Sequence, residues 1–223
     1  MATKEPQTAD PRLPLTRDRV LQAAIDLADE AGIDALSMRK LGQALGVEAM
    51  SLYNHVTNKD DILSGMVDIV ESGIELPPPA ADWKPALRTI AISAHDVFEL
   101  HPWAAGLTLS AVGTRPARLK YMNAILGHLR RAGFSPEMTD LAYHALESHI
   151  AGFTLWAAQL QVDADELRDL AAAFIRELPV DEFPYVVEHI QQHIKERDPE
   201  SVGTFAFGLD LILDGLERIR DSA

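Results

Sequence analysis

The chain has no cysteine among its 223 residues, so it can form neither a disulfide nor a thiolate site. It also has no apolar run near the roughly 18 residues that a membrane-spanning helix needs. Residues 1–15 are polar and proline-rich and lack the apolar core of a signal peptide, so we expect a flexible N-terminal arm. These absences predict a cytoplasmic protein with no membrane partner, and a reducing compartment suits the lack of cysteine.

Positive charge is scarce as well. The 20 Lys and Arg residues face 34 Asp and Glu residues, which gives a net charge of −14 at pH 7. The first 70 residues hold seven basic and eleven acidic side chains and carry −4, and the remainder carries −10. DNA-binding domains are usually basic, so contact with DNA would depend on where the cations lie. The residues expected to form a basic strip on this acidic molecule are Arg12, Arg17, Arg19, Arg39, Lys40 and Lys59.

No alternating run long enough for a β-strand is present. Apolar residues instead recur at three- and four-residue spacing along the chain, which predicts an all-α fold. The proline run at residues 76–80, LPPPA, is a rigid break. We therefore predict two domains, a helix-turn-helix domain at residues 16–75 and a larger helical domain for ligand binding and dimerisation at residues 81–223.

The stretch from Thr16 to Val70 has the helix order of a helix-turn-helix, which places one short helix in the DNA major groove. A helix from about Arg17 to Ala31 is followed by two short helices and a fourth helix start. In the second helix, Met38, Leu41, Ala44 and Leu45 are expected to face inward. The residues expected to cap or end these helices are Thr16, Gly32, Ser37, Gly46, Asn58 and Gly73.

Residues 47–56 have the composition of a recognition helix. Leu52 and Val56 are four apart and should face the core, which leaves small and polar side chains outside. Ala and Met can contact a thymine methyl group, Asn pairs with adenine, Arg with guanine, and Tyr, His and Lys suit phosphates. The predicted DNA contacts are Thr16, Arg17, Arg39, Ala49, Met50, Ser51, Tyr53, Asn54, His55 and Lys59. Three short helices could also be mere packing, but the caps and the spacing agree in favouring a DNA reader.

The same stretch resembles the N-terminal domain of the tetracycline-repressor (TetR) family of bacterial transcription regulators. The residues that carry the resemblance are Ala23-Ala24, Gly32, Leu36-Ser37-Met38-Arg39, Leu41-Gly42, Leu45-Gly46-Val47, Ser51-Leu52-Tyr53, His55-Val56 and Asn58-Lys59. Looser similarity to the tetracycline repressors themselves lies at Gly113-Thr114-Arg115-Pro116, Gly152-Phe153-Thr154-Leu155 and residues 207–217. The resemblance covers about a quarter of the chain closely.

The resemblance implies a homodimeric repressor that binds a palindromic double-stranded operator and is released by a small molecule. Family dimers pair through a four-helix bundle, for which the helices beginning near Ser135 and Ser201 are the candidates. Two-fold symmetry would place the recognition helices about 34–36 Å apart or slightly more.

The tetracycline repressors hold a magnesium–drug chelate with His and Glu side chains, and this chain departs from that pattern. Ala111 aligns with the metal-binding His, Leu160 with the metal-linked Glu, and Glu75 with the drug-binding His. The resemblance therefore implies a different, unknown inducer. We predict no metal and no cofactor.

Ligand pockets in helical domains are apolar with a few polar anchors. The helices beginning near Trp83, Arg115 and Ser135 are expected to enclose one. The candidate lining residues are His95, Phe98, His101, Trp103, Met122, Leu126, His144, Glu147, Phe153 and Trp156. The alternative for each of them is an ordinary core or dimer contact, since aromatic side chains dominate cores generally.

Catalytic patterns are weak in this chain. His144 and Glu147 are one helical turn apart, but no activated nucleophile or phosphate-binding loop accompanies them. His189 and His193 are four apart but lack a third metal ligand in register. We therefore predict a ligand-responsive DNA-binding regulator and not an enzyme. Two alternatives stay open: a helical enzyme with an incidental helix-turn-helix, and a DNA-bound regulator that responds to a protein partner.

Overall fold

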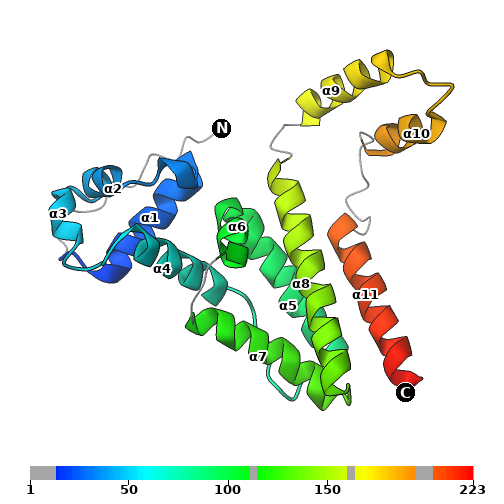
Figure 1. Ribbon diagram of the computed structural model, residues 1–223, viewed down its shortest axis with the longest axis horizontal. Coiled ribbons are helices and arrows are strands. Elements are labelled where there is room, and N and C mark those ends of the chain that lie inside the picture. Colours follow the sequence, from blue (N-terminus) through cyan, green and yellow to red (C-terminus); the bar gives the residue numbers. More distant parts are fainter. Residues whose placement is uncertain (1–13, 111–114, 160–163, 194–202, 223) are drawn as a thin grey trace.

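The computed structural model describes residues 14–110, 115–159, 164–193 and 203–222, and the regular elements within these ranges are all helices (Figure 1). The all-α prediction is confirmed. The expected N-terminal arm lies outside the described residues, apart from Pro14 and Leu15. Among the described helices, none is both long enough and apolar enough to cross a bilayer.

The N-terminal unit consists of four α-helices and one short 3-10 turn. These are α1 (Arg17–Ala31), the 3-10 turn (Ile33–Ala35), α2 (Met38–Leu45), α3 (Ala49–Leu52) and α4 (Lys59–Ser72). In Figure 1, α2 and α3 lie at the end of the molecule remote from α11. The N-terminal unit therefore presents its two shortest helices outward.

Side-chain caps set the starts of α1, α2 and α4, as predicted. Thr16 Oγ1 accepts a hydrogen bond from the backbone N–H of Arg19, and Ser37 Oγ accepts one from the backbone N–H of Lys40. Asn58 Oδ1 accepts from the N–H of Asp61 at 2.8 Å. Each cap satisfies a helix N–H that has no partner within its own helix. The predicted helix starts are therefore confirmed.

Two glycines shape the turn between α2 and α3. Gly46 takes the left-handed conformation, with φ 69°, at the end of α2, where a side chain would be strained. A Cβ at Gly42 would lie 2.9 Å from the carbonyl oxygen of Val47 and 3.2 Å from the backbone nitrogen of Ala49. The backbone leading into α3 can therefore pack closely on α2 only because residue 42 has no side chain.

One inward residue of α2 was predicted wrongly. Leu41, Gly42 and Leu45 are buried, whereas Ala44 is exposed. The buried stripe follows the i, i+3, i+4, i+7 spacing that starts at Met38, and Ala44 falls beside that stripe. Small size rather than burial explains alanine at this position.

Packing of α1 on α4 holds the N-terminal unit together. The buried face of α1 includes Leu21, whose side-chain methyl groups would lie within 2.9 Å of a Cβ at Gly65 of α4. One helical turn earlier on both helices, the Arg17 guanidinium forms a two-pronged ion pair with Asp61, with nitrogen–oxygen distances of 2.6 and 2.9 Å. An apolar contact and an ionic contact therefore fix the α1–α4 separation together.

The C-terminal body is a helical bundle. It contains α5 (Trp83–Leu100), α6 (Pro102–Ser110), α7 (Pro116–Arg131), α8 (Pro136–Gln159) and α11 (Thr204–Asp221). Helix α5 packs against α7, α8 and α11, and α8 also packs against α7 and α11. The break predicted at residues 76–80 lies in the segment between α4 and α5.

Helices α9 (Ala164–Glu177) and α10 (Pro184–His193) stand away from the bundle and pack mainly on each other (Figure 1). Their exposed side chains include Leu170, Phe174 and Tyr185. Within the protomer, α9 and α10 therefore add little to the main core.

Polar contacts join the N-terminal unit to the body. Helix α4 packs on α6 and α7, and α1 packs on α6. The carboxylate of Asp68 accepts from the N–H of Ala117 at 2.9 Å, in the first turn of α7. Asp29 of α1 accepts from Trp103 Nε1 at 2.6 Å. Both domains therefore lie in one continuous structure.

The close approach at Gly42 predicts that Gly42→Ala destabilises the N-terminal unit. Overpacking lowers the free energy of unfolding by about 1–3 kcal/mol. Alanine is more favourable than glycine within a helix by about 1 kcal/mol, so the net effect should be destabilising. Thermal unfolding followed by circular dichroism should show a lower melting temperature. Gly106→Ala is the matched control, because a Cβ at Gly106 of α6 would meet no atom within 4 Å. Equal melting temperatures for the two variants would contradict the close approach.

The Arg17–Asp61 ion pair predicts an acid-dependent share of stability. The hydrogen bonds from Arg17 and from the Thr57 backbone lower the pKa of Asp61 to about 2. Because this value lies below that of an unfolded chain, the unfolded chain binds the proton first, and stability is lost as the pH falls from about 4 to about 2. Urea unfolding measures the free energy of unfolding at pH 5 and at pH 3. Between these two pH values it should fall less for Asp61→Asn than for Asp60→Asn, which leaves the ion pair intact. An identical drop would show that the pair does not contribute.

Candidate DNA-binding surface and ligand-binding body

Helix α3 presents the outward face that a recognition helix needs. Leu52 and Val56 are buried, whereas Met50 is 75% exposed and Tyr53 is 47% exposed. Of the other predicted contacts, Asn54 is exposed, and Ala49, Ser51 and His55 are partly buried. An exposed methionine beside polar side chains offers contact with both thymine methyl groups and hydrogen-bonding base edges.

Cations lie on both sides of α3. Arg39 and Lys40 are exposed on α2, and Lys59 is exposed at the start of α4. Arg19 instead donates to the carbonyl oxygen of Pro14, and Arg17 pairs with Asp61. The exposed basic side chains nearest to α3 in sequence are thus those of α2 and the α4 start, a placement suited to phosphates along a groove.

Three of the ten predicted ligand residues meet in one aromatic cluster. His95 of α5 stacks on Phe205 of α11 at a centroid distance of 4.1 Å, and Phe153 of α8 meets both rings edge-on at 5.5 Å. Trp156 contacts Phe153 and is 45% exposed. His95 Nδ1 is buried without a hydrogen-bond partner. The cluster therefore combines aromatic faces with one unused polar atom.

Phe205 and His149 belong to this cluster but were missed as ligand candidates. The ring of Phe205 is flanked by His95 on one side and by His149, at 4.8 Å, on the other. His149 Nε2 lies 2.9 Å from the Phe205 carbonyl oxygen. His149 is four residues before Phe153, so a same-face search of that helix could have found it, whereas Phe205 is remote in sequence.

Glu147 lies in a second group, made of charged and phenolic side chains. Its carboxylate accepts from the Tyr121 hydroxyl at 2.6 Å and from Arg118. Arg118 also donates to the Tyr143 hydroxyl at 3.1 Å, and burial raises the pKa of Tyr143 to about 12. The phenols therefore remain protonated donors at neutral pH. Arg118 and Tyr121 were not anticipated from sequence.

This polar group reaches the N-terminal unit through Glu71 of α4. The Glu71 carboxylate is buried, 3.4 Å from Arg115 and 3.8 Å from Arg118. Burial raises the pKa of Glu71, and the two arginines partly offset that effect. Glu71, Arg118 and Glu147 thus connect α4, α7 and α8 through charges that are buried at Glu71 and partly buried at the other two residues.

The other predicted ligand residues are placed apart. His101 Nδ1 lies 2.8 Å from Asp29, so His101 and Trp103 both bond to α1. The side chain of His144 is 68% exposed and lies 3.6 Å from Asp140, so it does not meet Glu147 as an acid–base pair. Phe98 is buried in the core, and two further candidates pack partly buried against it, namely Met122 and Leu126.

One group of described residues has donor atoms close enough to hold a metal ion. Ligand atoms of His95, Asp96 and Glu99 lie within 4.8 Å of one another, and both carboxylates are exposed. Consecutive and i+4 positions on α5 produce this proximity without any other helix. Ala111 and Leu160, the positions aligned with metal-linked residues, lie outside the described residues, and Glu75 is exposed.

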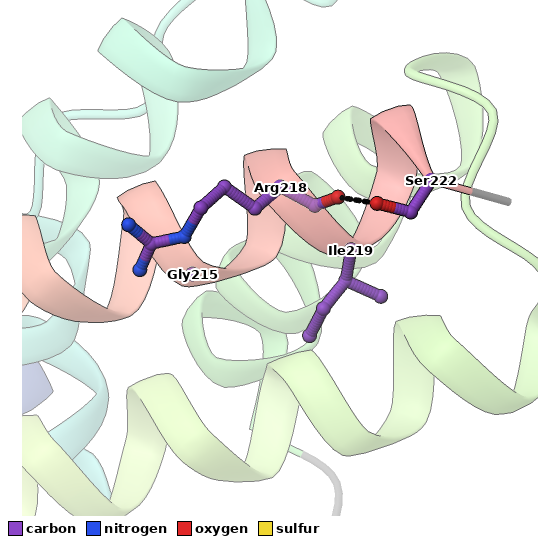
Figure 2. Close-up of a pocket in the computed structure, with 4 residues that line it drawn as sticks. All are labelled: Gly215, Arg218, Ile219 and Ser222. Carbon is purple, nitrogen blue, oxygen red and sulfur yellow. Dashed lines mark hydrogen bonds between the residues drawn. The ribbon is translucent and has the colours of Figure 1, made fainter.

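The C-terminal end of α11 carries an open hollow of about 500 Å³. Its lining residues are Gly215, Arg218 and Ile219 of α11 and Ser222, which caps the end of that helix, as Figure 2 shows. Drug-sized sites usually bury most of the ligand between several elements. A hollow lined by one helix is better suited to another protein surface.

Two family models together match most of the chain. The model described as "Bacterial regulatory proteins, tetR family" matches residues 20–66, and the model described as "Tetracyclin repressor-like, C-terminal domain" matches residues 76–220. The first match contains α2, α3 and the turn between them, and the second contains the body.

Individual proteins agree with the family models. The HTH-type transcriptional repressor DrrR1 of Streptomyces coeruleorubidus is 30% identical, over 93% of this chain and 79% of DrrR1. The class D tetracycline repressor of Escherichia coli is 32% identical, over 91% of this chain and 89% of that repressor. The crystal structure of the Streptomyces coelicolor TetR family protein ActR in complex with actinorhodin is 28% identical, has a TM-score of 0.73, and covers 93% of this chain and 99% of ActR. With these matches and the exposed recognition helix, the chain belongs to the TetR family of bacterial transcriptional repressors, which bind DNA through a helix-turn-helix.

Proposed function

We propose that this chain is a homodimeric repressor that binds a palindromic operator and leaves it when a small molecule binds the C-terminal body. The observation that carries the proposal is the face of α3. Met50, Tyr53 and Asn54 are turned to solvent, while Leu52 beside them is fully buried. A one-sided short helix of this kind is suited to the major groove.

Within this proposal the predicted DNA contacts divide into two roles. Base edges are read by side chains of α3 and by Arg39, and phosphates are held from the flanking positions. The residues proposed for base reading are Ala49, Met50, Ser51, Asn54 and Arg39. The residues proposed for phosphate contact are Thr16, Tyr53, His55 and Lys59. With so few cations, non-specific affinity should be weak.

Exposed apolar side chains on α8 and α11 support a homodimer. They are large, and they lie on the two helices that the family resemblance assigns to pairing. The exposed residues are Leu141, Leu155, Trp156, Phe207, Leu211 and Ile219. A second copy would remove this surface from water at about 25 cal/mol per Å² of apolar area. The hollow beside Ile219 (Figure 2) is part of the same face and would be filled by the partner in a two-fold interface.

The body is the proposed site of the inducer. Titles of similar structures describe ActR with actinorhodin and with (S)-DNPA, so a similar protein binds small molecules. In this chain the aromatic cluster and the phenol–carboxylate group each include a residue of α8, Phe153 in the first and Glu147 in the second. We propose that the ligand contacts the two groups, with rings for stacking and Tyr121 or Glu147 for hydrogen bonding.

We propose regulation rather than catalysis, and the match to a family of transcriptional regulators supports this proposal. Access to chromosomal DNA places the proposed action in the cytoplasm. No metal or cofactor is required by the proposal.

The proposal predicts saturable, salt-sensitive binding to DNA immediately upstream of the chain's own gene, in preference to random DNA. Lys59→Ala should weaken binding to every duplex and reduce the slope of log affinity against log salt by about 0.9, the value for one phosphate contact. Asn54→Ala should instead change preference among duplexes by about 1–3 kcal/mol at one base position. Titration at two salt concentrations measures both effects. Equal affinity for all duplexes would refute operator binding.

The α8–α11 face predicts that Leu211→Glu gives monomers, because the new carboxylate would be buried in the dimer without a partner. Sedimentation equilibrium at micromolar concentration measures the change in mass. Leu119→Glu on α7 is the matched control, since its leucine is 51% exposed against 55% for Leu211. A dimeric Leu211→Glu protein would place the interface elsewhere.

A further inference from the structure

Arg17 joins three segments around the recognition helix. Its Nη1 and Nη2 donate to the two carboxylate oxygens of Asp61 at 2.9 and 2.6 Å. The same Nη1 donates to the carbonyl oxygen of His55 at 3.3 Å. The guanidinium therefore connects the start of α1, the turn that follows α3, and the first turn of α4.

Asp61 extends this contact into the turn between α3 and α4. Its Oδ2 accepts from the backbone N–H of Thr57 at 2.8 Å, and its own N–H donates to Asn58. The backbone of residues 55–58 is consequently held at His55 by Arg17, at Thr57 by Asp61, and at Asn58 by the cap. The end of α3 has no other ion pair among the described residues.

The register of α1 on α4 keeps Arg17 in reach of Asp61. Leu21 and Gly65 make the apolar contact one turn further along both helices, and a Cβ at Gly65 would also lie 3.4 Å from Arg17 Nη2. A larger residue at position 65 would separate the two helices. This two-pronged contact, the Arg17–Asp61 fork, is partly exposed, with 44% of the Arg17 side chain and 27% of the Asp61 side chain open to solvent, but the packed helix pair beneath it keeps its two partners in register.

We propose that Arg17 and Asp61 position the recognition helix, and that Arg17 is a positioning residue rather than the direct DNA contact predicted from the sequence. The inference rests on the proposed operator binding. Two of the guanidinium nitrogens are used within the protein, and a bidentate Arg–carboxylate pair is geometrically specific. An unpaired carboxylate at Asp61 would repel DNA phosphates. Because the Arg17–Asp61 pair is neutral as a whole, neither side chain presents a net charge to the DNA.

The geometry makes an unusual prediction for Asp61→Asn. Removal of a carboxylate next to DNA should strengthen binding by charge alone, whereas loss of the fork should weaken binding to the preferred duplex. We expect Arg17→Ala and Asp61→Asn each to lower that affinity about tenfold, which corresponds to a base contact worth about 1.4 kcal/mol. Affinity for random DNA should not fall in Asp61→Asn, and the slope of log affinity against log salt should remain that of the unaltered protein in both variants.

The DNA experiment uses the duplex that the unaltered protein selects from a random 30-base-pair pool, with random duplex as the reference. Arg17→Lys tests geometry against charge, because an ammonium group retains the charge but cannot make the fork. We expect it to bind as poorly as Arg17→Ala. Asp60→Asn is the matched control and should bind the selected duplex at least as well as the unaltered protein. Two results would identify Arg17 as a phosphate ligand and overturn the inference. One is that Arg17→Lys binds the selected duplex as tightly as the unaltered protein. The other is that Arg17→Ala reduces the slope of log affinity against log salt by about 0.9.

Amide hydrogen exchange of the free protein tests the positioning itself. Arg17→Ala and Asp61→Asn should speed exchange in peptides that cover residues 53–58, and Asp60→Asn should not. Unchanged exchange in both variants would overturn the inference even if DNA binding fell. If the unaltered protein selects no duplex, the proposed operator binding fails, and the exchange measurement still decides whether the fork orders the turn.

Discussion

The proposed DNA-reading surface depends on a helix too short to be stable alone. Helix α3 spans four residues, and so short a helix has too few internal hydrogen bonds to offset the cost of nucleation. Its conformation is imposed from outside. Leu52 and Val56 anchor it in the core, the bare backbone of Gly42 lets it approach α2, and the fork between Arg17 and Asp61 holds the turn that follows. Sequence-reading side chains can therefore vary while the residues beneath them keep their geometry.

The second constraint is the way in which α4 enters the body. Glu71 is almost fully buried, and the cations near it among the described residues are Arg115 and Arg118, while Asp68 adds a like charge. A buried carboxylate without a cation is costly, so α4 and α7 cannot separate far without a large electrostatic penalty. Arg118 also bonds to Glu147 of α8, so a displacement of α8 would alter the field around Glu71. The polar junction between the domains is therefore sensitive to the helix that carries most of the aromatic cluster.

Local rules of chain geometry made the N-terminal unit predictable. The caps at Thr16, Ser37 and Asn58 and the glycine at position 46 each act within four residues, so the sequence displays them directly. The body was less readable because its contacts are long-range. His101 and Trp103 bond to an aspartate more than 70 residues away, and His95 stacks on a ring 110 positions later. Those partners could not be inferred from spacing along one helix.

The placement of the few exposed cations has a kinetic consequence. Residues 71–223 carry −10 and the first 70 residues carry −4, and the exposed cations Arg39, Lys40 and Lys59 lie around the tip that holds α2 and α3. This tip is remote from α11 (Figure 1), so the small group of cations is set apart from much of the acidic body. DNA would repel the acidic body more strongly than the tip. The electric field between the two molecules would therefore turn an approaching protein so that α2 and α3 face the DNA. Encounters in the wrong orientation would be short, which would limit the time spent on non-cognate sequence.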